Sequence, residues 1–299
     1  MYMGYQIVLW GMGKTYNYIR NTLCYHELTN QINVVCVTAS ELPEAEFVDG
    51  YKIVKPENLN NVKYDYIFVL SDDYYEQIVN DAVTIYGISR DKIIRYNILL
   101  IPEINLQRYF KLYESKITIL SNNCWGGIVY NTLGMECRSP LKNLFLKEKD
   151  YLKLISNPKF YFSHMPHFKM YTEDSNSSRK YPVLELVDIE IHCNHTDSSE
   201  EAIAEWNRRV RKVNYNNIFC EMYTENRKTA GVFEKLGKYD HRICFVPWDT
   251  NLQHQMKLEL GTRQSYFWET VNSNAGVGNN ALTYKLIDLL LGEKNYRLT

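Results

Sequence analysis

Short apolar runs alternate with amphipathic segments along the first third of the chain. The runs typical of buried strands are residues 6–10, 33–38, 64–70 and 93–94. A helix is predicted over residues 15–23. A second one follows Ser71, where apolar side chains recur with helical spacing until Gly87. Strands that alternate with helices form parallel sheets with right-handed crossovers, so this part is predicted to be a Rossmann-like domain.

The pattern begins again after a charged, helical segment at residues 102–114. The predicted strands of this second part are residues 116–120, 187–192, 218–223 and 243–248, and the predicted helices are residues 125–133, 150–155, 199–213, 226–236 and 281–291. Residues 158–181 are predicted to form an irregular excursion, with the polar run 174–179 on the surface. We therefore expect an α/β fold of two Rossmann-like three-layer units with mostly parallel sheets, residues 1–110 and 111–299.

The composition narrows the functional classes. Hydrophobic residues make up 45% of the 299-residue chain and charged residues 23%, as in folded globular proteins. The net charge of −1 gives the whole chain no attraction to nucleic acid, so no nucleic-acid partner is expected. A small molecule, either a nucleotide-sugar or a glycan precursor, is the partner considered. No signal peptide is visible and no apolar stretch approaches the roughly 20 residues that cross a bilayer, which predicts a cytoplasmic location. Seven cysteines without a CxxC pair favour neither a disulfide framework nor a Cys-rich zinc site.

A glycine-rich turn follows the first predicted strand. Glycines there let a phosphate approach the N-terminus of the next helix, so we expect ligand binding at Gly11, Gly13, Lys14 and Thr15. The dinucleotide fingerprint is incomplete, because Tyr16 takes the third glycine position and no acid stands directly after the second strand. A nucleotide-sugar, another phosphorylated ligand, or a purely structural glycine turn are the alternatives.

Polar side chains follow four predicted strands of the second part. They are Ser121, Asn122, Asn123 and Cys124, then His192, Asn194 and His195, then Thr224 and Glu225, and finally Asp249. The ligands of parallel α/β sheets collect beyond the carboxyl ends of the strands, so these residues predict a site. We expect Ser121, Asn122 and Asn123 to bind the ligand.

Cys124 is the candidate nucleophile. It stands at the start of a helix, where the helix dipole favours a thiolate. With His192 or His195 nearby it could serve acyl or glycosyl transfer. The simpler alternative, which we favour from the residues alone, is a small buried cysteine beside Trp125.

Three further polar residues share one face of the strand 187–192, because side chains alternate along a strand. These are Asp188, Glu190 and His192, and with His195 they would supply four ligands to a divalent metal or a general acid–base pair. A polar strand face without a metal is the favoured interpretation, and no metal is assigned.

The motifs SNNCWGG, SPLKNLF, DIEIH and EAIAEWNRRVRKVNY lie within residues 115–250. This stretch resembles the bacterial family catalogued as domain of unknown function 1919, whose members are often labelled exopolysaccharide biosynthesis proteins. The segments IVLWGMGK, GYKIVKPENL and YDYIFVLSDDYYEQI resemble the small Rossmann-like domains of bacterial surface-sugar enzymes. The resemblance implies surface polysaccharide assembly and transferase chemistry, but supplies no reaction.

The leading hypothesis is therefore a transferase acting on an activated sugar, with Cys124, His192, His195, Asp188 and Glu190 as catalytic candidates. A non-catalytic protein that binds a nucleotide or nucleotide-sugar is the alternative, and an NAD-dependent oxidoreductase is the second alternative. The cofactor and the oligomeric state are left open.

Overall fold

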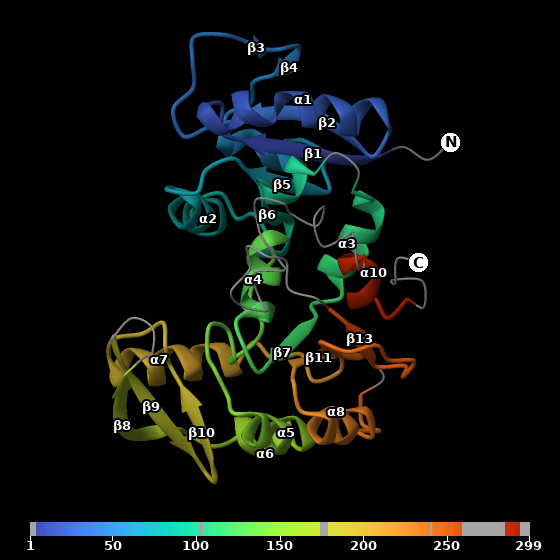
Figure 1. Cartoon of the computed structure of the whole chain (residues 1–299). Coiled ribbons are helices and arrows are strands. Elements are labelled where there is room, and N and C mark those ends of the chain that lie inside the picture. The colour runs from blue at the N-terminus through green and yellow to red at the C-terminus, as the bar shows by residue number, and fades with distance from the viewer. Residues whose placement is uncertain (1–3, 102–103, 174–178, 240, 259–284, 294–299) are drawn as a thin grey trace. The chain divides into compact units, whose positions relative to one another are not determined.

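The computed structural model describes residues 4–101, 104–173, 179–239, 241–258 and 285–293 (Figure 1). The chain divides into two compact units. Unit 1 consists of residues 1–110 with 132–135, and unit 2 of residues 111–131 with 136–299. Each unit contains a parallel sheet and helices, so the predicted α/β class is confirmed.

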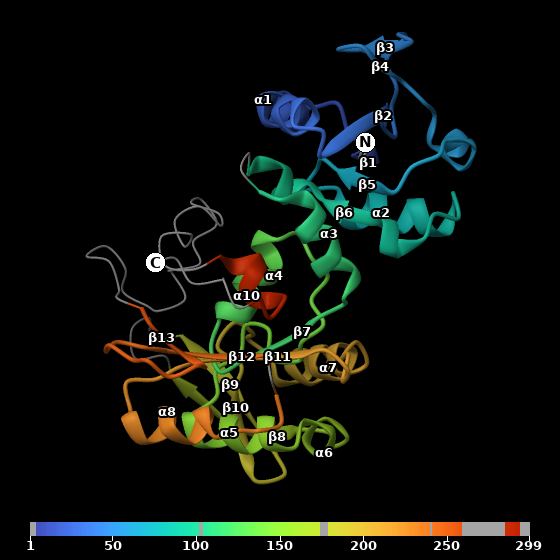
Figure 2. The same cartoon turned by 90° about the vertical axis from the view of Figure 1, so that its right-hand side faces the viewer.

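Unit 1 is built on a four-stranded parallel sheet. Its strands, in the order β2-β1-β5-β6, are β2 Ile32–Thr38, β1 Tyr5–Trp10, β5 Tyr66–Val69 and β6 Ile93–Arg95. The helices α1 Lys14–Leu28 and α2 Tyr75–Thr84 lie on opposite faces of this sheet (Figure 2). Opposite faces follow from right-handed crossovers, because the chain leaves β1 toward one edge and β5 toward the other. The order reverses between β1 and β5, which makes their carboxyl ends a topological switch point.

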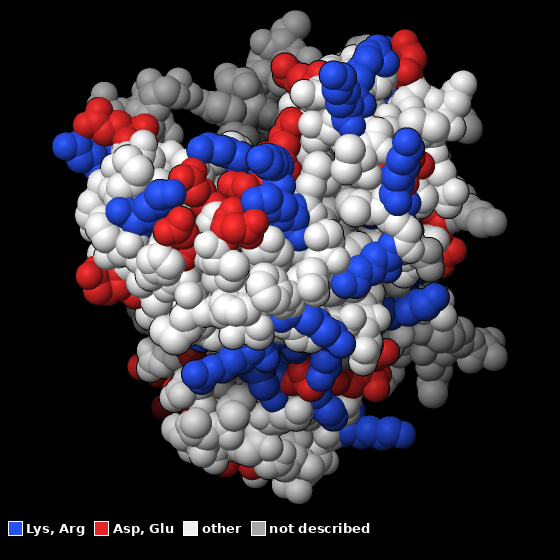
Figure 3. All heavy atoms as spheres, turned by 90° about the horizontal axis from the view of Figure 1, so that it is seen from below, with Lys and Arg blue, Asp and Glu red and all other residues white. Residues whose placement is uncertain are grey.

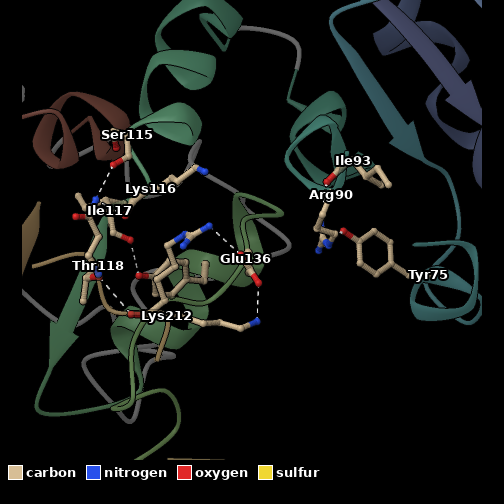
Figure 4. Close-up of polar contacts among 12 residues, drawn as sticks. Tyr75, Arg90, Ile93, Ser115, Lys116, Ile117, Thr118, Glu136 and Lys212 are labelled. Atoms are coloured by element: carbon tan, nitrogen blue, oxygen red, sulfur yellow. Dashed lines mark hydrogen bonds and ion pairs between the residues drawn. The ribbon is translucent and has the colours of Figure 1, made fainter. Parts of the chain in front are cut away.

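Short elements complete unit 1. They are the hairpin β3 Phe47–Val48 and β4 Tyr51–Lys52, the 3-10 helices Pro56–Asn61, Arg90–Lys92 and Tyr96–Leu100, and α3 Leu106–Glu114, which runs across the boundary into unit 2. Arg90 joins two of the main elements, since its guanidinium donates to the Ile93 carbonyl at 2.9 Å and to the Tyr75 hydroxyl at 3.2 Å (Figure 4).

Unit 2 contains a second four-stranded parallel sheet. In the order β13-β12-β11-β7, its strands are β13 Gln255–Lys257, β12 Arg242–Val246, β11 Ile218–Tyr223 and β7 Thr118–Ser121. Its helices are α4 Trp125–Thr132, α5 Glu148–Ser156, α6 Pro158–Phe162, α7 Ser199–Val210, α8 Arg227–Glu234 and α10 Leu286–Leu290. The views place α5 and α8 on one side of this sheet and α4 on the other (Figures 1 and 2). The predicted helix 281–291 is described only from residue 285 onward.

A second sheet in unit 2 corrects two expectations. It is antiparallel, in the order β10-β9-β8, with β8 His167–Glu173, β9 Lys180–Leu186 and β10 Ile189–His192. The prediction that residues 187–192 join the parallel sheet is wrong. Only two residues separate β9 from β10, and only antiparallel neighbours can be joined so tightly. The predicted irregular excursion at 158–181 is wrong as well, because it contains α6 and the paired strands β8 and β9, although residues 174–178 lie outside the described residues.

Buried aromatic rings fix α4 against the parallel sheet of unit 2. The fully buried Trp125 stacks on Phe219 of β11, with ring centroids 6.1 Å apart, and meets Phe245 of β12 at 5.9 Å. Lys212, beyond the end of α7, holds the segment after α4, with its Nζ 2.5 Å from Glu136 Oε1 (Figure 4). The start of α4, where Cys124 stands, is therefore held rigidly by the core.

Candidate functional site

The thiol of Cys124 and the imidazole of His195 form a pair in unit 2. Cys124 Sγ lies 3.4 Å from His195 Nε2, within hydrogen-bond distance for sulfur. Cys124 stands between the end of β7 and the start of α4, and His195 follows β10 in the next sheet. Cys124 is buried and His195 is exposed, so the imidazole is the part of the pair that solvent reaches directly.

Main-chain hydrogen bonds bring these distant residues together. Leu146 N donates to the Asn122 carbonyl at 3.1 Å, which fixes the segment before α5 to the end of β7. The neighbouring residue, Phe145, exchanges two hydrogen bonds of 3.0 Å with His192 at the end of β10. This segment therefore bridges the two sheets and carries the loop with His195 to the thiol.

Burial keeps both partners neutral. It raises the pKa of the Cys124 thiol to about 11, and no nearby charge opposes that shift strongly enough to lower it. His195 is exposed on one side, but the protein around the rest of its ring desolvates it in part, and this lowers its pKa with help from the positive charge of Arg179. The expected thiolate is therefore not what the structure favours, because desolvation outweighs the helix dipole at this position. At neutral pH the pair is a thiol beside an unprotonated imidazole, which is the form in which His195 can accept the thiol proton.

Ser121, Asn122 and Asn123 face inward. All three are buried, and their side chains make hydrogen bonds inside the protein. Asn123 Oδ1 accepts from Trp125 N at 2.7 Å, Asn123 Nδ2 donates to Asn122 Oδ1 at 2.9 Å, and Ser121 Oγ accepts from Gly126 N at 3.2 Å. Two main-chain donors at the start of α4 are thus satisfied from within, so these residues support the thiol rather than present themselves to a ligand.

Glu221 is the residue that the sequence analysis missed. It lies in β11 and is fully buried, and its carboxyl group forms a short hydrogen bond with Ser121 Oγ and accepts one of 3.5 Å from Asn123 Nδ2. Burial raises its pKa to about 8, although both hydrogen bonds act in the opposite direction. The available signal was a single acid inside the apolar strand IFCEMY, since buried charges occur in cores only with dedicated partners.

Close packing around the start of α4 requires glycine at positions 126 and 127. A Cβ on Gly126 would lie 3.1 Å from Ile119 Cγ2 and 3.2 Å from Ser121 Cβ. A Cβ on Gly127 would lie 2.5 Å from Asn143 Oδ1. The absence of these side chains therefore lets β7 and the segment after α4 approach the first turn of the helix.

Asp188 and Glu190 are committed to other partners. Asp188 lies in the β9–β10 loop, 2.7 Å from Lys153 Nζ and 2.8 Å from the Tyr161 hydroxyl. Glu190 lies between two lysines, at 2.8 Å from Lys147 Nζ and 2.9 Å from Lys169 Nζ, and their hydrogen bonds lower its pKa to about 2. Acidic and basic side chains also meet on the face that Figure 3 shows. The structure does not bring these two carboxylates to the thiol.

His192 packs beside Phe145, with ring centroids 5.5 Å apart, and its Nδ1 is 3.4 Å from the Tyr181 hydroxyl. Burial lowers its pKa. Its Nε2 is 3.9 Å from Glu190 Oε2, so it shares a face with Glu190 as predicted. Within the described ranges no three His, Cys, Asp or Glu side chains cluster as metal ligands, and the four ligands considered for a divalent metal are not brought together.

The remaining predicted strand-end residues have partners of their own. Thr224 Oγ1 bonds to Glu148, Tyr223 donates to Glu225 at 3.0 Å, and Asp249 lies 3.2 Å from Lys257. The convergence expected at four strand ends is therefore reduced to one pair, Cys124 with His195, and the buried residues behind it.

The glycine turn of unit 1 is open to solvent. Gly11 has a φ of 125°, its N–H donates to the Thr38 carbonyl at 2.8 Å, and a Cβ there would lie 3.2 Å from Leu70 Cβ. Gly13 has nothing within 4 Å of the space that a Cβ would take. Helix α1 begins at Lys14 without a side-chain cap and without an acid in its first turn, and Thr15 is half-buried beside it.

Tyr16 shows why the dinucleotide pattern breaks here. Its ring is buried, and its hydroxyl donates to Asp49 at 2.8 Å, while Arg20 reaches the same carboxylate at 2.9 Å. The hairpin β3–β4 is thereby attached to α1, at the helix turn where the third fingerprint glycine would allow close packing. This arrangement gives no support to the oxidoreductase alternative.

No described helix is long and apolar enough to cross a membrane. A curated, uncharacterised protein of Haemophilus influenzae is 35% identical over 144 residues, which cover 47% of this chain and 66% of that relative. Residues 3–94 match the family model described as C2185-like, N-terminal. Residues 95–289 match the model described as Domain of unknown function (DUF1919), a longer stretch than the motifs within 115–250 indicated. More than half of the sequence is included in that match, and the chain therefore belongs to the DUF1919 family.

Proposed function

We propose that this protein is a transferase that passes a glycosyl group from an activated sugar to an acceptor in surface polysaccharide assembly. The observation that supports it is the distance of 3.4 Å between Cys124 Sγ and His195 Nε2 at the carboxyl edge of a parallel sheet. The choice of substrate rests on the family resemblance of the motifs SNNCWGG and DIEIH. Cys124 is the nucleophile in this proposal, and His195 is its general base.

The proposed reaction has two displacements. Sγ attacks the anomeric carbon of the donor while His195 Nε2 takes the thiol proton, and the bond to the leaving oxygen breaks with its electron pair on that oxygen. His195 then releases the proton to solvent. An acceptor hydroxyl attacks the same carbon and gives its proton to His195, the carbon–sulfur bond breaks with its electrons on Sγ, and His195 returns the proton to the thiolate.

The raised pKa of Cys124 means that the thiol needs a base, and the lowered pKa of His195 leaves its imidazole unprotonated at neutral pH, although it also makes that imidazole a weaker base. A thiol that is not ionised at neutral pH needs a base, and an imidazole that is unprotonated at neutral pH can act as one. A preformed ion pair is not required. Removal of His195 is therefore expected to slow the first displacement by a factor of about 10²–10⁴, the usual contribution of a general base.

The test is intact-mass analysis after acid quenching of the purified protein with a set of nucleotide-sugars. We expect a mass increase of one glycosyl group that maps to Cys124, is absent in Cys124→Ala and forms slowly in His195→Gln. Cys24→Ala is the matched control, because Cys24 is an exposed cysteine with no role in the proposal. An adduct that persists in Cys124→Ala, or no adduct and no transfer with any donor, would refute the proposal.

A second candidate function is binding of a nucleotide or phosphorylated sugar by unit 1. It is favoured by the position of Gly11 and Gly13 at the switch point between β1 and β5, with the uncapped start of α1 exposed. Such a ligand would raise the melting temperature, since binding at 100 times the dissociation constant stabilises the folded state by about 2.7 kcal/mol. Gly13→Ala should abolish that shift, and an equal shift in the variant would exclude this turn.

A further inference from the structure

The side chain of Glu221 connects β11 to the turn that carries Cys124. Among the described residues, its carboxyl group is hydrogen-bonded to two side chains, those of Ser121 and Asn123. Both side chains also accept a hydrogen bond from the main chain at the first turn of α4. Ser121 Oγ accepts from Gly126 N at 3.2 Å, and Asn123 Oδ1 accepts from Trp125 N at 2.7 Å. Glu221 is therefore connected to the main chain of the first turn of α4, directly after Cys124, by two chains of hydrogen bonds, one through Ser121 and one through Asn123.

We infer that Glu221 is a positioning residue for Cys124: it orients Ser121 and Asn123, and through them it fixes the first turn of α4 and the thiol on it. This inference rests on the proposed role of Cys124. Glu221 itself is fully buried and touches neither the thiol nor solvent in the structure. A glutamine of the same shape would keep both hydrogen bonds, so charge and shape can be separated by experiment.

The protonation state of Glu221 changes the links. Burial raises its pKa to about 8, so at neutral pH its carboxyl group can donate a proton to Ser121 Oγ, whereas above pH 8 it can only accept. Ser121 must then turn its own hydroxyl proton toward Glu221. Three other titratable groups of the described residues face this site. His195 Nε2 lies 3.4 Å from the thiol, and its lowered pKa leaves it unprotonated over the pH range of interest. Tyr151 of α5, whose hydroxyl contacts the Glu221 carbonyl at 2.6 Å, and Cys244 of β12 are kept neutral by burial.

Burial is the only cause that raises the pKa of Cys124, so Glu221 acts on the thiol through Ser121 and Asn123. Once Glu221 ionises, both links from the first turn of α4 end on a negative charge, which opposes formation of the thiolate. The reactivity of Cys124 should therefore rise with pH up to about 8, where Glu221 ionises, and more slowly above it. The variant Glu221→Gln lacks that ionisation. It should match the wild type at pH 7 and exceed it several-fold at pH 9.

The experiment measures the rate of alkylation of Cys124 by iodoacetamide in the full-length protein, by peptide mass spectrometry, from pH 6 to pH 10. We expect an inflection near pH 8 in the wild type and none in Glu221→Gln. Cys24, alkylated in the same samples, is the internal control and should give the same profile in both proteins. Superimposable Cys124 profiles, or a wild-type profile without the inflection, would overturn the inference.

This readout needs no substrate, so its failure can be told apart from failure of the transferase proposal. An inflection that depends on Glu221 without any glycosyl adduct would remove the proposed reaction and leave the positioning role. Circular dichroism checks the fold of Glu221→Gln. If that variant does not fold, a wild-type profile without the inflection still overturns the inference.

Discussion

The turns that follow β1 in unit 1 and β7 in unit 2 differ in what they present at the start of the next helix. After β1 of unit 1, the chain turns through Gly11 and Gly13 and offers main-chain groups at the uncapped start of α1. After β7 of unit 2, buried side chains satisfy the start of α4 from within, and a thiol and an imidazole meet beside it. The same strand–turn–helix arrangement thus presents a backbone in one unit and reactive side chains in the other.

The contrast separates two kinds of chemistry. A glycine turn before an uncapped helix suits an anion, because no side chain accepts from the first N–H groups of the helix or blocks the approach to them. A capped helix start has fewer free donors, but it holds its first residues firmly. Cys124 benefits from that rigidity, whereas Gly13 benefits from open space.

The largest expected loss of stability comes from a substitution in the glycine turn of unit 1. Gly11→Ala should lower the stability of unit 1 by about 1–3 kcal/mol, because a φ of 125° is strained for any residue with a Cβ and Leu70 lies close. Gly13→Ala should change stability by less than about 1 kcal/mol, since its Cβ meets nothing. Urea denaturation of both variants measures this, and equal losses would show that the two glycines do not differ as the structure indicates.

A smaller change in stability is expected from substitutions in the hairpin loops of the two units. The β3–β4 loop has Asp49 and Gly50 at φ of 48° and 87°, whereas the β9–β10 loop has the β-branched Val187 at 61°. Val187→Gly removes the strain of a β-branched residue at positive φ, but glycine also makes the unfolded chain more flexible, which offsets part of this gain. The variant should therefore stabilise unit 2 by less than about 1 kcal/mol. Gly50→Val should act in the opposite direction in unit 1. Melting temperatures of the two variants test the sign, and a fall with Val187→Gly would contradict it.

The smallest effect at neutral pH concerns His26 of unit 1. It is fully buried on α1, and burial lowers its pKa. The unfolded chain therefore binds a proton below pH of about 6.5 that the folded chain does not, and stability is lost as the pH falls from there. His26→Leu should make the loss between pH 7.5 and pH 5.5 smaller, while the exposed His164→Gln should leave it unchanged. Equal losses in wild type and His26→Leu would rule out this contribution.

The sequence predicted most of the elements because their periods are local. The apolar runs at 6–10, 33–38 and 64–70 became β1, β2 and β5, with ends within two residues. The hairpin β3–β4 was missed, since strands of two residues have no period to detect. The pairing of β9 with β10 was missed because no strand was predicted over residues 180–186, and the loop residues Val187 and Asp188 were counted into the strand 187–192.

The site was predicted only in part. Cys124 was identified by its place at a predicted helix start, but His192 and His195 were equal candidates as its partner. The main chain of His192 is hydrogen-bonded to the main chain of Phe145, and this bridge places the side chain of His195 at the thiol. Such a choice depends on contacts between residues 71 positions apart, which no local pattern records.

The sequence by itself determined the α/β class, the order of most strands and helices, the glycine turn and the cysteine at the end of a strand. Those features follow from side-chain period and from the conformational freedom of glycine, which act over a few residues. Only the tertiary structure decided that Ser121 and Asn123 face inward, that Glu221 lies behind them and that burial keeps the thiol protonated. Desolvation and hydrogen bonding depend on what surrounds a group in space, and that surrounding exists only once the distant strands have come together.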